Sequence, residues 1–182
     1  SDVSLIEDGE VDRSFETVIG GIRVKGPMMR IHTVAAGGGS LCQFDGESLS
    51  VGPESAGAWP GPLCYGRAGD SGKSAASELA LTDVNFALGR VQPDRFPFAL
   101  DEAPVNQALD RQRDHFEKAG LPRSADEIAS GYIEVANANM AQAIAQVSVA
   151  RGVDPRDHAL VGFGGAAGQH VCAIARLLEL PR

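Results

Sequence analysis

A chain of 182 residues, of which 43% are hydrophobic, is long enough to form one domain with a core of its own. Its formal net charge of −8 argues against the basic surface that nucleic-acid binding requires, and no apolar run approaches the roughly 20 residues of a membrane-spanning helix. The three cysteines, Cys42, Cys64 and Cys172, form no C-x-x-C pair, so the composition predicts neither a zinc site nor a disulfide framework but a reduced, cytoplasmic setting.

The chain begins with a pattern that predicts a β-hairpin. In residues 1–26, stretches of apolar and polar side chains alternate with the period of a strand. Asp8 and Gly9 interrupt this alternation, and the pair is typical of a two-residue hairpin turn. Gly26 and Pro27 are expected to end the second strand, because proline lacks the backbone donor that a central strand needs.

A second hairpin is expected after a short strand. Residues 31–36 are a short, mostly apolar run that predicts a strand leading into three glycines. Residues 40–51 repeat the hairpin pattern, with Asp45 and Gly46 as the turn. Residues 52–82 are rich in glycine and proline, so we expect an irregular insertion there.

The segment GDSGKS, residues 69–74, is similar to a phosphate-binding P-loop. That motif needs an additional glycine five positions earlier, a preceding strand and a following helix. Arg67 stands at the position of that glycine, and no apolar strand precedes it. We therefore expect a polar surface loop here rather than a nucleotide site.

The second half of the chain predicts helices. Asp101 can cap a first helix, which is expected to end at Gly120. Ser124 and Glu127 have the spacing of a capping box, and a long helix with an apolar stripe follows as far as Gly152. The apolar side of this helix is expected to face the core.

The last part of the chain predicts a strand, a turn and a helix. Residues 158–165, HALVGFGG, predict a compact buried strand that ends in glycines, and residues 166–180 predict the last helix. Two hairpins and a strand are thus followed by helix, strand, glycine turn and helix. This order predicts an α/β domain with a mixed sheet.

Two glycine-rich segments are candidates for ligand binding. A turn within residues 162–170 would point backbone N–H groups and a helix dipole at one place, which suits a nucleotide. Tight packing of a strand on a helix also selects glycine, so both interpretations stay open. Gly37, Gly38 and Gly39 pose a related question: either the backbone needs dihedral angles closed to other residues, or something large lies against it.

A few polar side chains are candidates for chemistry. Asp2 has the carboxylate that can hold Mg²⁺ beside phosphates, although an aspartate at such a position is normally solvated. His32 lies in an apolar run, where a core role is commoner, whereas His170 follows the glycine turn and is better placed for a substrate. Asn137 and Asn139 are poor helix formers in a helix centre, so at least one is expected to bond another group.

Five stretches together resemble the hydantoinase A/5-oxoprolinase family. They follow one another through residues 1–180 and are SDVSLIEDG, GPMMRIHTVAAGGGS, VGPESAGAWPGPLCYGR, TDVNFALGR and FGGAAGQHVCAIA. The second and the last stretch are most similar to the ATP-dependent 5-oxoprolinase branch of that family.

The resemblance implies an ATPase of the actin-like superfamily, in which two ribonuclease-H-like lobes enclose ATP. Residues 1–182 would be part of the family domain, its C-terminal lobe, cut from a longer chain. Ser1 and Asp2 would end a phosphate-binding hairpin, and Asp2 would also hold Mg²⁺. The adenosine motif would consist of Gly164, Gly165 and Ala166.

The implied reaction is the ATP-dependent opening of a cyclic amide. Phosphorylation of the amide oxygen would let water open the ring, which turns 5-oxoproline into glutamate. His32 and His170 would be catalytic. A backbone cradle for phosphate or for the activated lactam would consist of Gly37, Gly38, Gly39 and Ser40. The rival interpretation of these glycines is a turn with positive φ angles and no ligand.

Other functions stay open at this point. Hydantoin hydrolysis and a subunit of an ATP-dependent ketone carboxylase are alternatives within the family, and a non-catalytic assembly module is an alternative outside enzymes. The expected partners are a lactam, the missing N-terminal lobe and a hydantoinase B-type subunit or domain. Because half of the nucleotide site would lie upstream, the piece alone is expected to be inactive.

Overall fold

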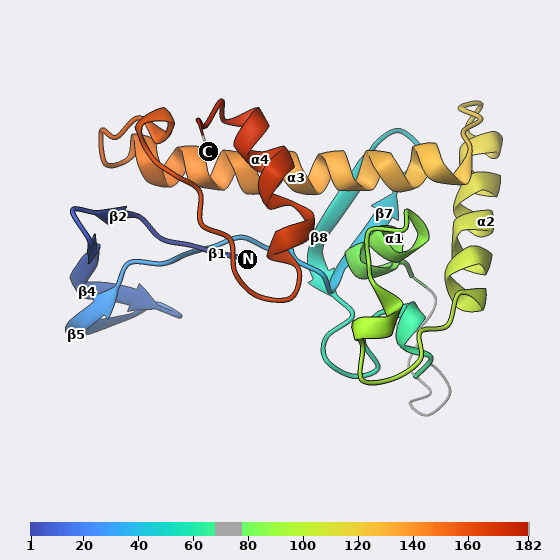
Figure 1. Ribbon diagram of the computed structural model, residues 1–182, viewed down its shortest axis with the longest axis horizontal. Helices are drawn as coiled ribbons and strands as arrows, with labels where there is room; N and C mark the ends of the chain where they lie inside the picture. Colours follow the sequence, from blue (N-terminus) through green and yellow to red (C-terminus); the bar gives the residue numbers. More distant parts are fainter. Residues whose placement is uncertain (68–77, 182) are drawn as a thin grey trace.

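Strands occupy the first 55 residues and helices follow them, as Figure 1 shows. The computed structural model describes residues 1–67 and 78–181, so the P-loop-like segment at residues 69–74 lies outside the described residues. The strands are β1 (Asp2–Val3), β2 (Ile6–Glu7), β3 (Glu10–Val11), β4 (Arg13–Ile19), β5 (Ile22–Met29), β6 (His32–Thr33), β7 (Ser40–Phe44) and β8 (Leu49–Ser55). The helices are η1 (Leu63–Tyr65), α1 (Leu81–Ala87), η3 (Pro93–Arg95), α2 (Ala103–Lys118), α3 (Ala125–Val149), η4 (Pro155–Asp157), η5 (Ala167–Gln169) and α4 (Val171–Leu177). The expected order, with hairpins first and helices afterwards, is confirmed.

The strands form separate antiparallel pairs: β1 with β6, β2 with β3, β4 with β5, and β7 with β8. The described residues therefore do not form the single mixed sheet that the sequence predicts. A parallel pair needs a second strand after the crossover helix. Residues 158–165 should supply that strand, but they pair with no described strand.

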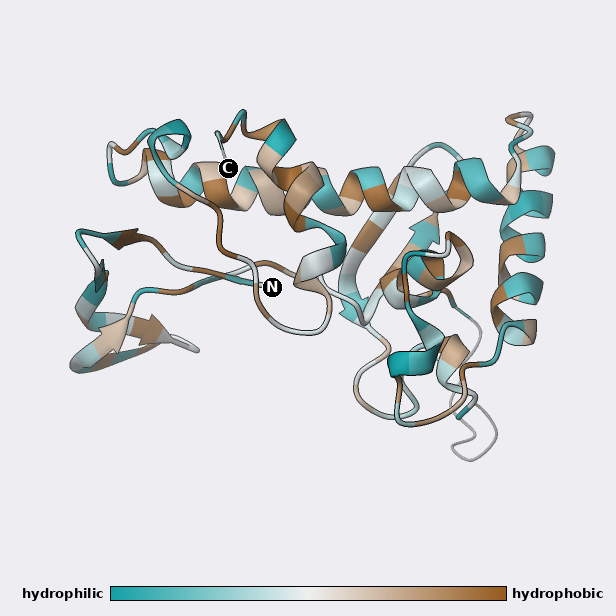
Figure 2. Cartoon of the chain, in the orientation of Figure 1, coloured by the Kyte–Doolittle hydropathy of each residue, from teal (hydrophilic) through white to brown (hydrophobic). Residues whose placement is uncertain are grey.

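The buried strand predicted at residues 158–165 is wrong. The segment runs from η4 towards η5 without strand pairing, and the side chains of Val161 and Phe163 are 77% and 88% exposed. Apolar side chains in such a run become buried only where other elements cover both faces. Figure 2 shows hydrophobic colouring in this segment and on the β4–β5 hairpin, where Phe15 and Ile22 are also exposed.

The first hairpin turn is confirmed, but the strand end predicted at Gly26 is not. Asp8 and Gly9 link β2 to β3 and have φ angles of 52° and 78°, the left-handed values that this turn requires. Gly26 and Pro27 lie inside β5, at a register shift between β4 and β5. A β-bulge accommodates proline because the ladder is already interrupted there.

The second hairpin positions the middle of the molecule. The carboxylate of Asp45 accepts hydrogen bonds from the backbone N–H groups of Glu47 and Ser48, at 2.9 and 2.8 Å, which fixes the predicted turn. β8 continues to Ser55, so regular structure extends into the segment expected to be irregular from residue 52. β7 is buried because it lies between β8 and a bridge to Ala80.

The second long helix begins as predicted, whereas in the first the N-cap position is Glu102 and Asp101 lies one residue before it. The carboxylate of Asp101 accepts a hydrogen bond from the Ala103 N–H at the start of α2, and Gly120 follows this helix with a φ angle of 75°. Ser124 and Glu127 form the capping box of α3, and the hydrogen bonds from Ser124 lower the pKa of Glu127. None of the described helices is long and apolar enough to cross a membrane.

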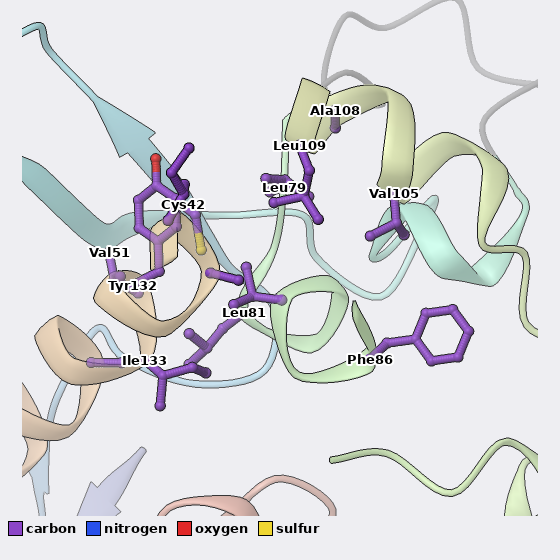
Figure 3. Packing of buried hydrophobic residues seen from close by; sticks show 14 of the residues in the cluster. Cys42, Val51, Leu79, Leu81, Phe86, Val105, Ala108, Leu109, Tyr132 and Ile133 are labelled. Carbon is purple, nitrogen blue, oxygen red and sulfur yellow. The ribbon is translucent and has the colours of Figure 1, made fainter. Parts of the chain in front are cut away.

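The core lies where α1, α2 and α3 meet the β7–β8 hairpin (Figure 3). The phenol of Tyr132 on α3 is buried, and its hydroxyl donates to the side-chain oxygen of Gln112 on α2 at 3.1 Å. The rings of Phe44 and Phe116 stack with their centroids 3.9 Å apart. These contacts join the hairpin to both long helices.

Helix α1 is the central element that the sequence does not predict. Its Asp83 is fully buried, and the carboxylate accepts hydrogen bonds from the N–H groups of Leu63, Cys64 and Ala80 at 3.0, 2.8 and 2.8 Å. Burial, together with the negative charge of Asp83, raises the pKa of the Cys42 and Cys64 thiols. Asp83 thus ties the turn at η1 to the start of α1.

Candidate functional site

The beginning of the chain lies against the glycine segment, defined here as residues 37–39. The backbone nitrogen of Ser1 donates to the carbonyl oxygens of Val34 and Ala36 at 2.8 and 3.0 Å. A Cβ atom added to Gly37 would lie 3.7 Å from the nitrogen of Ser1. The hydroxyl of Ser40 accepts a hydrogen bond from the Gly37 N–H at 3.0 Å and so holds the segment in place.

The same segment also meets the turn before α4. A Cβ atom on Gly38 would lie 2.7 Å from Oγ1 of Thr82 and 3.5 Å from Cβ of Ala166. The carbonyl oxygen of Gly38 accepts the N–H of Thr82 at 2.8 Å. Three distant parts of the sequence, near Ser1, Gly38 and Ala166, therefore come together, and the start of α1 supports them.

Gly38 and Gly39 are required for space, whereas a Cβ atom on Gly37 would make only an ordinary van der Waals contact. None of the three has a positive φ angle, so the turn with left-handed dihedral angles considered above is wrong for them. A Cβ on Gly39 would lie 2.9 Å from Oγ of Ser55, as tight as the contact that a Cβ on Gly38 would make. Something does lie against these glycines, and in the folded chain it includes Thr82, Ala166 and Ser55.

Asp2 lies at one end of this meeting point. Its Oδ1 accepts a hydrogen bond from the hydroxyl of Thr33 at 2.7 Å, across the pair formed by β1 and β6. The residue is exposed, and the described residues contain no group of three or more histidine, cysteine, aspartate or glutamate side chains that could hold a metal. Mg²⁺ is usually held by one or two carboxylates together with substrate phosphates. Asp2 therefore fits a metal that arrives with phosphates.

The glycine turn before α4 borders a cavity of about 790 Å³, which we call the arginine-lined cavity. It lies between the segment around η3, one face of α3 and the start of α4. Its lining is Arg90, Val91, Gln92, Arg95, Phe96, Ser130, Ile133, Glu134, Asn137, Gly165, Gly168, Gln169, Cys172, Ala173 and Arg176.

This cavity is basic although the chain as a whole is acidic. Its lining contains three arginines and one acidic side chain, Glu134. None of these arginines forms an ion pair with a residue in the described part of the chain. Gly165 is exposed, and nothing lies within 4 Å of the place where its Cβ would be. A ligand with anionic groups or a flat ring can approach the backbone here.

His170 lies behind the lining and is only 1% exposed. Its Nδ1 lies 2.8 Å from Oδ1 of Asn137, so the imidazole donates from Nδ1 to that oxygen. The expectation that an asparagine in the centre of α3 bonds another group is thus confirmed. Nε2 is buried and has no partner among the described residues. Because the imidazole ring is buried, it does not contact a ligand in the cavity. Through Asn137 it connects the glycine turn to α3.

The pKa of His170 is lowered by burial and, to a smaller extent, by the positive charge of Arg90. The folded state therefore binds fewer protons here than the unfolded state, and stability must fall as the pH drops below about 6.5, the ordinary histidine value. Replacing His170 by glutamine is expected to remove this pH-dependent loss of stability. Urea denaturation at pH 7.5 and pH 5.5 measures it.

The exposed His115 on α2 provides the control for this measurement. The His115→Gln variant should keep the pH dependence of the parent chain. An unchanged pH dependence in the His170→Gln variant would show that protonation of His170 does not limit stability.

The second candidate histidine lies elsewhere. His32 is exposed on β6 and lines a different cavity of about 590 Å³, between β6, β8 and α3. His32 and His170 are therefore not brought together. The sequence reasoning also did not single out Thr82 or the three arginines of the other cavity. The arginines are hard to identify from the sequence, because isolated arginines are most often solvated.

The fold and these cavities define a mixed α/β protein in which a glycine segment joins the N-terminal strand to a turn beside an arginine-lined cavity. The family described as hydantoinase/oxoprolinase matches residues 1–182, and the chain belongs to that family.

Among curated relatives, a 5-oxoprolinase from Dictyostelium discoideum is 40% identical over 188 residues, which cover 96% of this chain and 14% of that protein. The crystal structure of the ATP-dependent caprolactamase from Pseudomonas jessenii matches with a TM-score of 0.76 and 36% identity, over 92% of this chain and 23% of its own. A nucleotide-free acetone carboxylase has a TM-score of 0.80 at 24% identity, over 98% and 24%, a likeness of fold alone. The chain thus spans a small part of each of these relatives.

Proposed function

We propose that the chain is the C-terminal, ribonuclease-H-like lobe of an ATP-dependent cyclic amide hydrolase, with 5-oxoproline as the favoured substrate. The family and the names of the relatives support the reaction class. The observation that carries the proposal is the contact of Gly38 with Ala166 beside Ser1, because it joins the two glycine-rich segments at one place. The other lobe and a hydantoinase B-type part would belong to the same assembly.

The proposed nucleotide path follows these contacts. The base and ribose lie against Gly164 and Gly165, where the arginine-lined cavity offers open space and guanidinium groups that stack on flat rings. The phosphates pass Ala166 and the glycine segment towards Asp2. Backbone N–H groups suit this part of the path because they stabilise charge on a transferring phosphoryl group without reorganisation.

The reaction is written with ATP as a substrate. The amide oxygen of the lactam takes the γ-phosphoryl group and ADP leaves. A first water adds to the activated carbon, and the carbon–nitrogen bond of the ring breaks, so that the nitrogen leaves as an amine and the carbon stays as an acyl phosphate. A second water then hydrolyses the acyl phosphate to the carboxylate and phosphate. Mg²⁺, held by Asp2 and the phosphates, would neutralise charge on the transferring group. Asp2 is the catalytic residue of this proposal, since its carboxylate lies at the phosphate end.

The two histidines have different roles in this proposal. His32 is exposed beside Thr33, the hydrogen-bond partner of Asp2, so it can reach a substrate at that end. His170 is a positioning residue, because its buried ring holds the glycine turn through Asn137.

The test is ATP hydrolysis by the full-length protein, measured with 5-oxoproline, with hydantoin, and with acetone plus bicarbonate. We expect 5-oxoproline to stimulate hydrolysis, and Asp2→Ala to reduce the stimulated rate by about 10³-fold, the upper range for removal of one transition-state contact. The control is Asp114→Ala, which removes an exposed carboxylate from α2. The 182-residue chain alone should be inactive.

The other outcomes are informative. If only hydantoin, or only acetone plus bicarbonate, stimulates ATP hydrolysis, the substrate is that of another branch of the family. The absence of ATP hydrolysis with every compound would favour an assembly module. An Asp2→Ala variant with full activity would remove the nucleotide path proposed above.

A further inference from the structure

The cavity that His32 lines, called here the amide cavity, has a lining of a different character from that of the arginine-lined cavity. It is a shallow, open cavity lined by β6, β8 and one face of α3, and its volume of about 590 Å³ lies within the range of small-molecule sites. Its lining contains no aspartate, glutamate, lysine or arginine. A ligand bound here is therefore recognised by hydrogen bonds and apolar contacts, and the lining favours an uncharged polar group.

Helix α3 contributes three carboxamide side chains to this cavity. They are Asn139, Gln142 and Gln146, which share one face of the helix. None of the three side chains has a hydrogen-bond partner within the described residues. Their donors and acceptors are thus available to a ligand.

Asn139 is the best placed of the three. It is half-buried in the middle of α3, where asparagine is an unfavourable residue for the helix itself. Asn137, on the other side of the helix, accepts a hydrogen bond from His170, which gives that asparagine a role in the fold. Asn139 has none, and its carboxamide borders the amide cavity.

A small lactam ring has a specific complementarity to a carboxamide. The ring forces its amide to be cis, so the N–H and the C=O lie on the same side of a planar group. The side-chain amide of asparagine likewise presents an oxygen acceptor and N–H donors side by side. The two groups can pair through two hydrogen bonds at once, which an open-chain trans amide cannot do.

We propose that the amide cavity binds the ring of the cyclic amide and that Asn139 recognises its amide edge. This inference rests on the proposed function and extends it to the binding of the second substrate. Thr33 lines the cavity and also donates its hydroxyl hydrogen to the carboxylate of Asp2. The ring amide therefore lies beside the end of the nucleotide path at which phosphoryl transfer is proposed. α3 packs against both β1 and β8, which keeps these walls together.

The test compares full-length protein with its Asn139→Ala variant in lactam-dependent ATP hydrolysis. We expect the KM for 5-oxoproline, and for 2-pyrrolidinone, the same ring without the carboxylate, to rise about 10- to 100-fold, as loss of two hydrogen bonds to the ligand predicts. The KM for ATP should change by less than about twofold, because the nucleotide lies elsewhere. Alanine is the better helix former, so the variant is expected to fold.

Asn106→Ala is the matched control, since Asn106 is exposed on α2. It should leave both KM values unchanged. An unchanged lactam KM in Asn139→Ala, or an equal rise in the KM for ATP, overturns the inference while leaving the proposed function in place.

If the full-length protein shows no lactam-dependent hydrolysis, calorimetric titration of 2-pyrrolidinone with a non-hydrolysable ATP analogue present decides the matter. Binding by the parent protein that Asn139→Ala abolishes supports the amide cavity even though the reaction proposed is wrong. Absence of binding by the parent protein overturns both.

Discussion

Replacement of Asp83 by alanine is expected to destabilise the chain by about 3–5 kcal/mol, because it leaves buried polar groups without partners. The carboxylate is fully buried and accepts the N–H groups of Leu63, Cys64 and Ala80. Alanine offers no acceptor, so three buried N–H groups lose their partner. The measurement is urea denaturation of the purified chain, followed by circular dichroism.

The control is Asp101→Ala, which removes an exposed carboxylate that accepts one N–H at the start of α2. Its cost should be about 1 kcal/mol, the usual value for a helix cap. Equal destabilisation by the two substitutions would show that Asp83 contributes no more than an ordinary surface cap. The Asp83→Asn variant should lie between them, because its amide oxygen still accepts hydrogen bonds while its NH₂ group faces donors.

Replacement of Gly38 by alanine should reduce the lactam-dependent ATP hydrolysis of the full-length protein about 10- to 100-fold, mainly through the KM for ATP. The added Cβ would lie 2.7 Å from Oγ1 of Thr82, so stability should also fall by about 1–3 kcal/mol. The loss of stability arises from the clash with Thr82 within the folded chain. The loss of activity requires a ligand beside Gly38.

The double variant Gly38→Ala with Thr82→Ala separates the two effects. Removal of the threonine hydroxyl relieves the clash, so we expect thermal denaturation to show that much of the lost stability returns. On the proposed nucleotide path activity should stay low, because the new methyl group still lies beside the phosphates that pass Gly38 and Ala166. Full recovery of activity would mean that Gly38 serves packing alone, and Thr82→Ala alone is the control for the missing hydroxyl.

Local signals in the sequence were sufficient for the turns and the helix ends. The pair Asp8 and Gly9 and the box of Ser124 and Glu127 appear where they were predicted. Asp101 bonds the start of α2 from one residue before its N-cap. These features depend on neighbouring residues only, since the turn needs two residues that accept positive φ angles and each cap bonds backbone within three positions of itself. The Ser1 and Ala166 contacts with the glycine segment are of another kind, because they join residues far apart in the chain.

Non-local partners explain what the sequence could not predict. Helix α1 is short, and its formation depends on hydrogen bonds that the Asp83 carboxylate accepts from backbone N–H groups about 20 residues earlier. The strand expected at residues 158–165 does not form, because its backbone pairs with no other strand of the described chain and its apolar side chains at Val161 and Phe163 stay exposed. A run of apolar residues predicts what a segment can bury, but it does not say whether another segment is present to cover it.

The sequence by itself determined the family, the order of hairpins and helices, and the glycine segments that depart from ordinary composition. Only the tertiary structure decided that Gly38 and Gly39 are needed for close approach, and that no glycine of residues 37–39 is needed for a positive φ angle. It also decided that His170 is buried against Asn137 while His32 is exposed at another cavity. The reason is physical: residue type limits local backbone conformation, whereas burial and contact depend on which distant segments fold against one another.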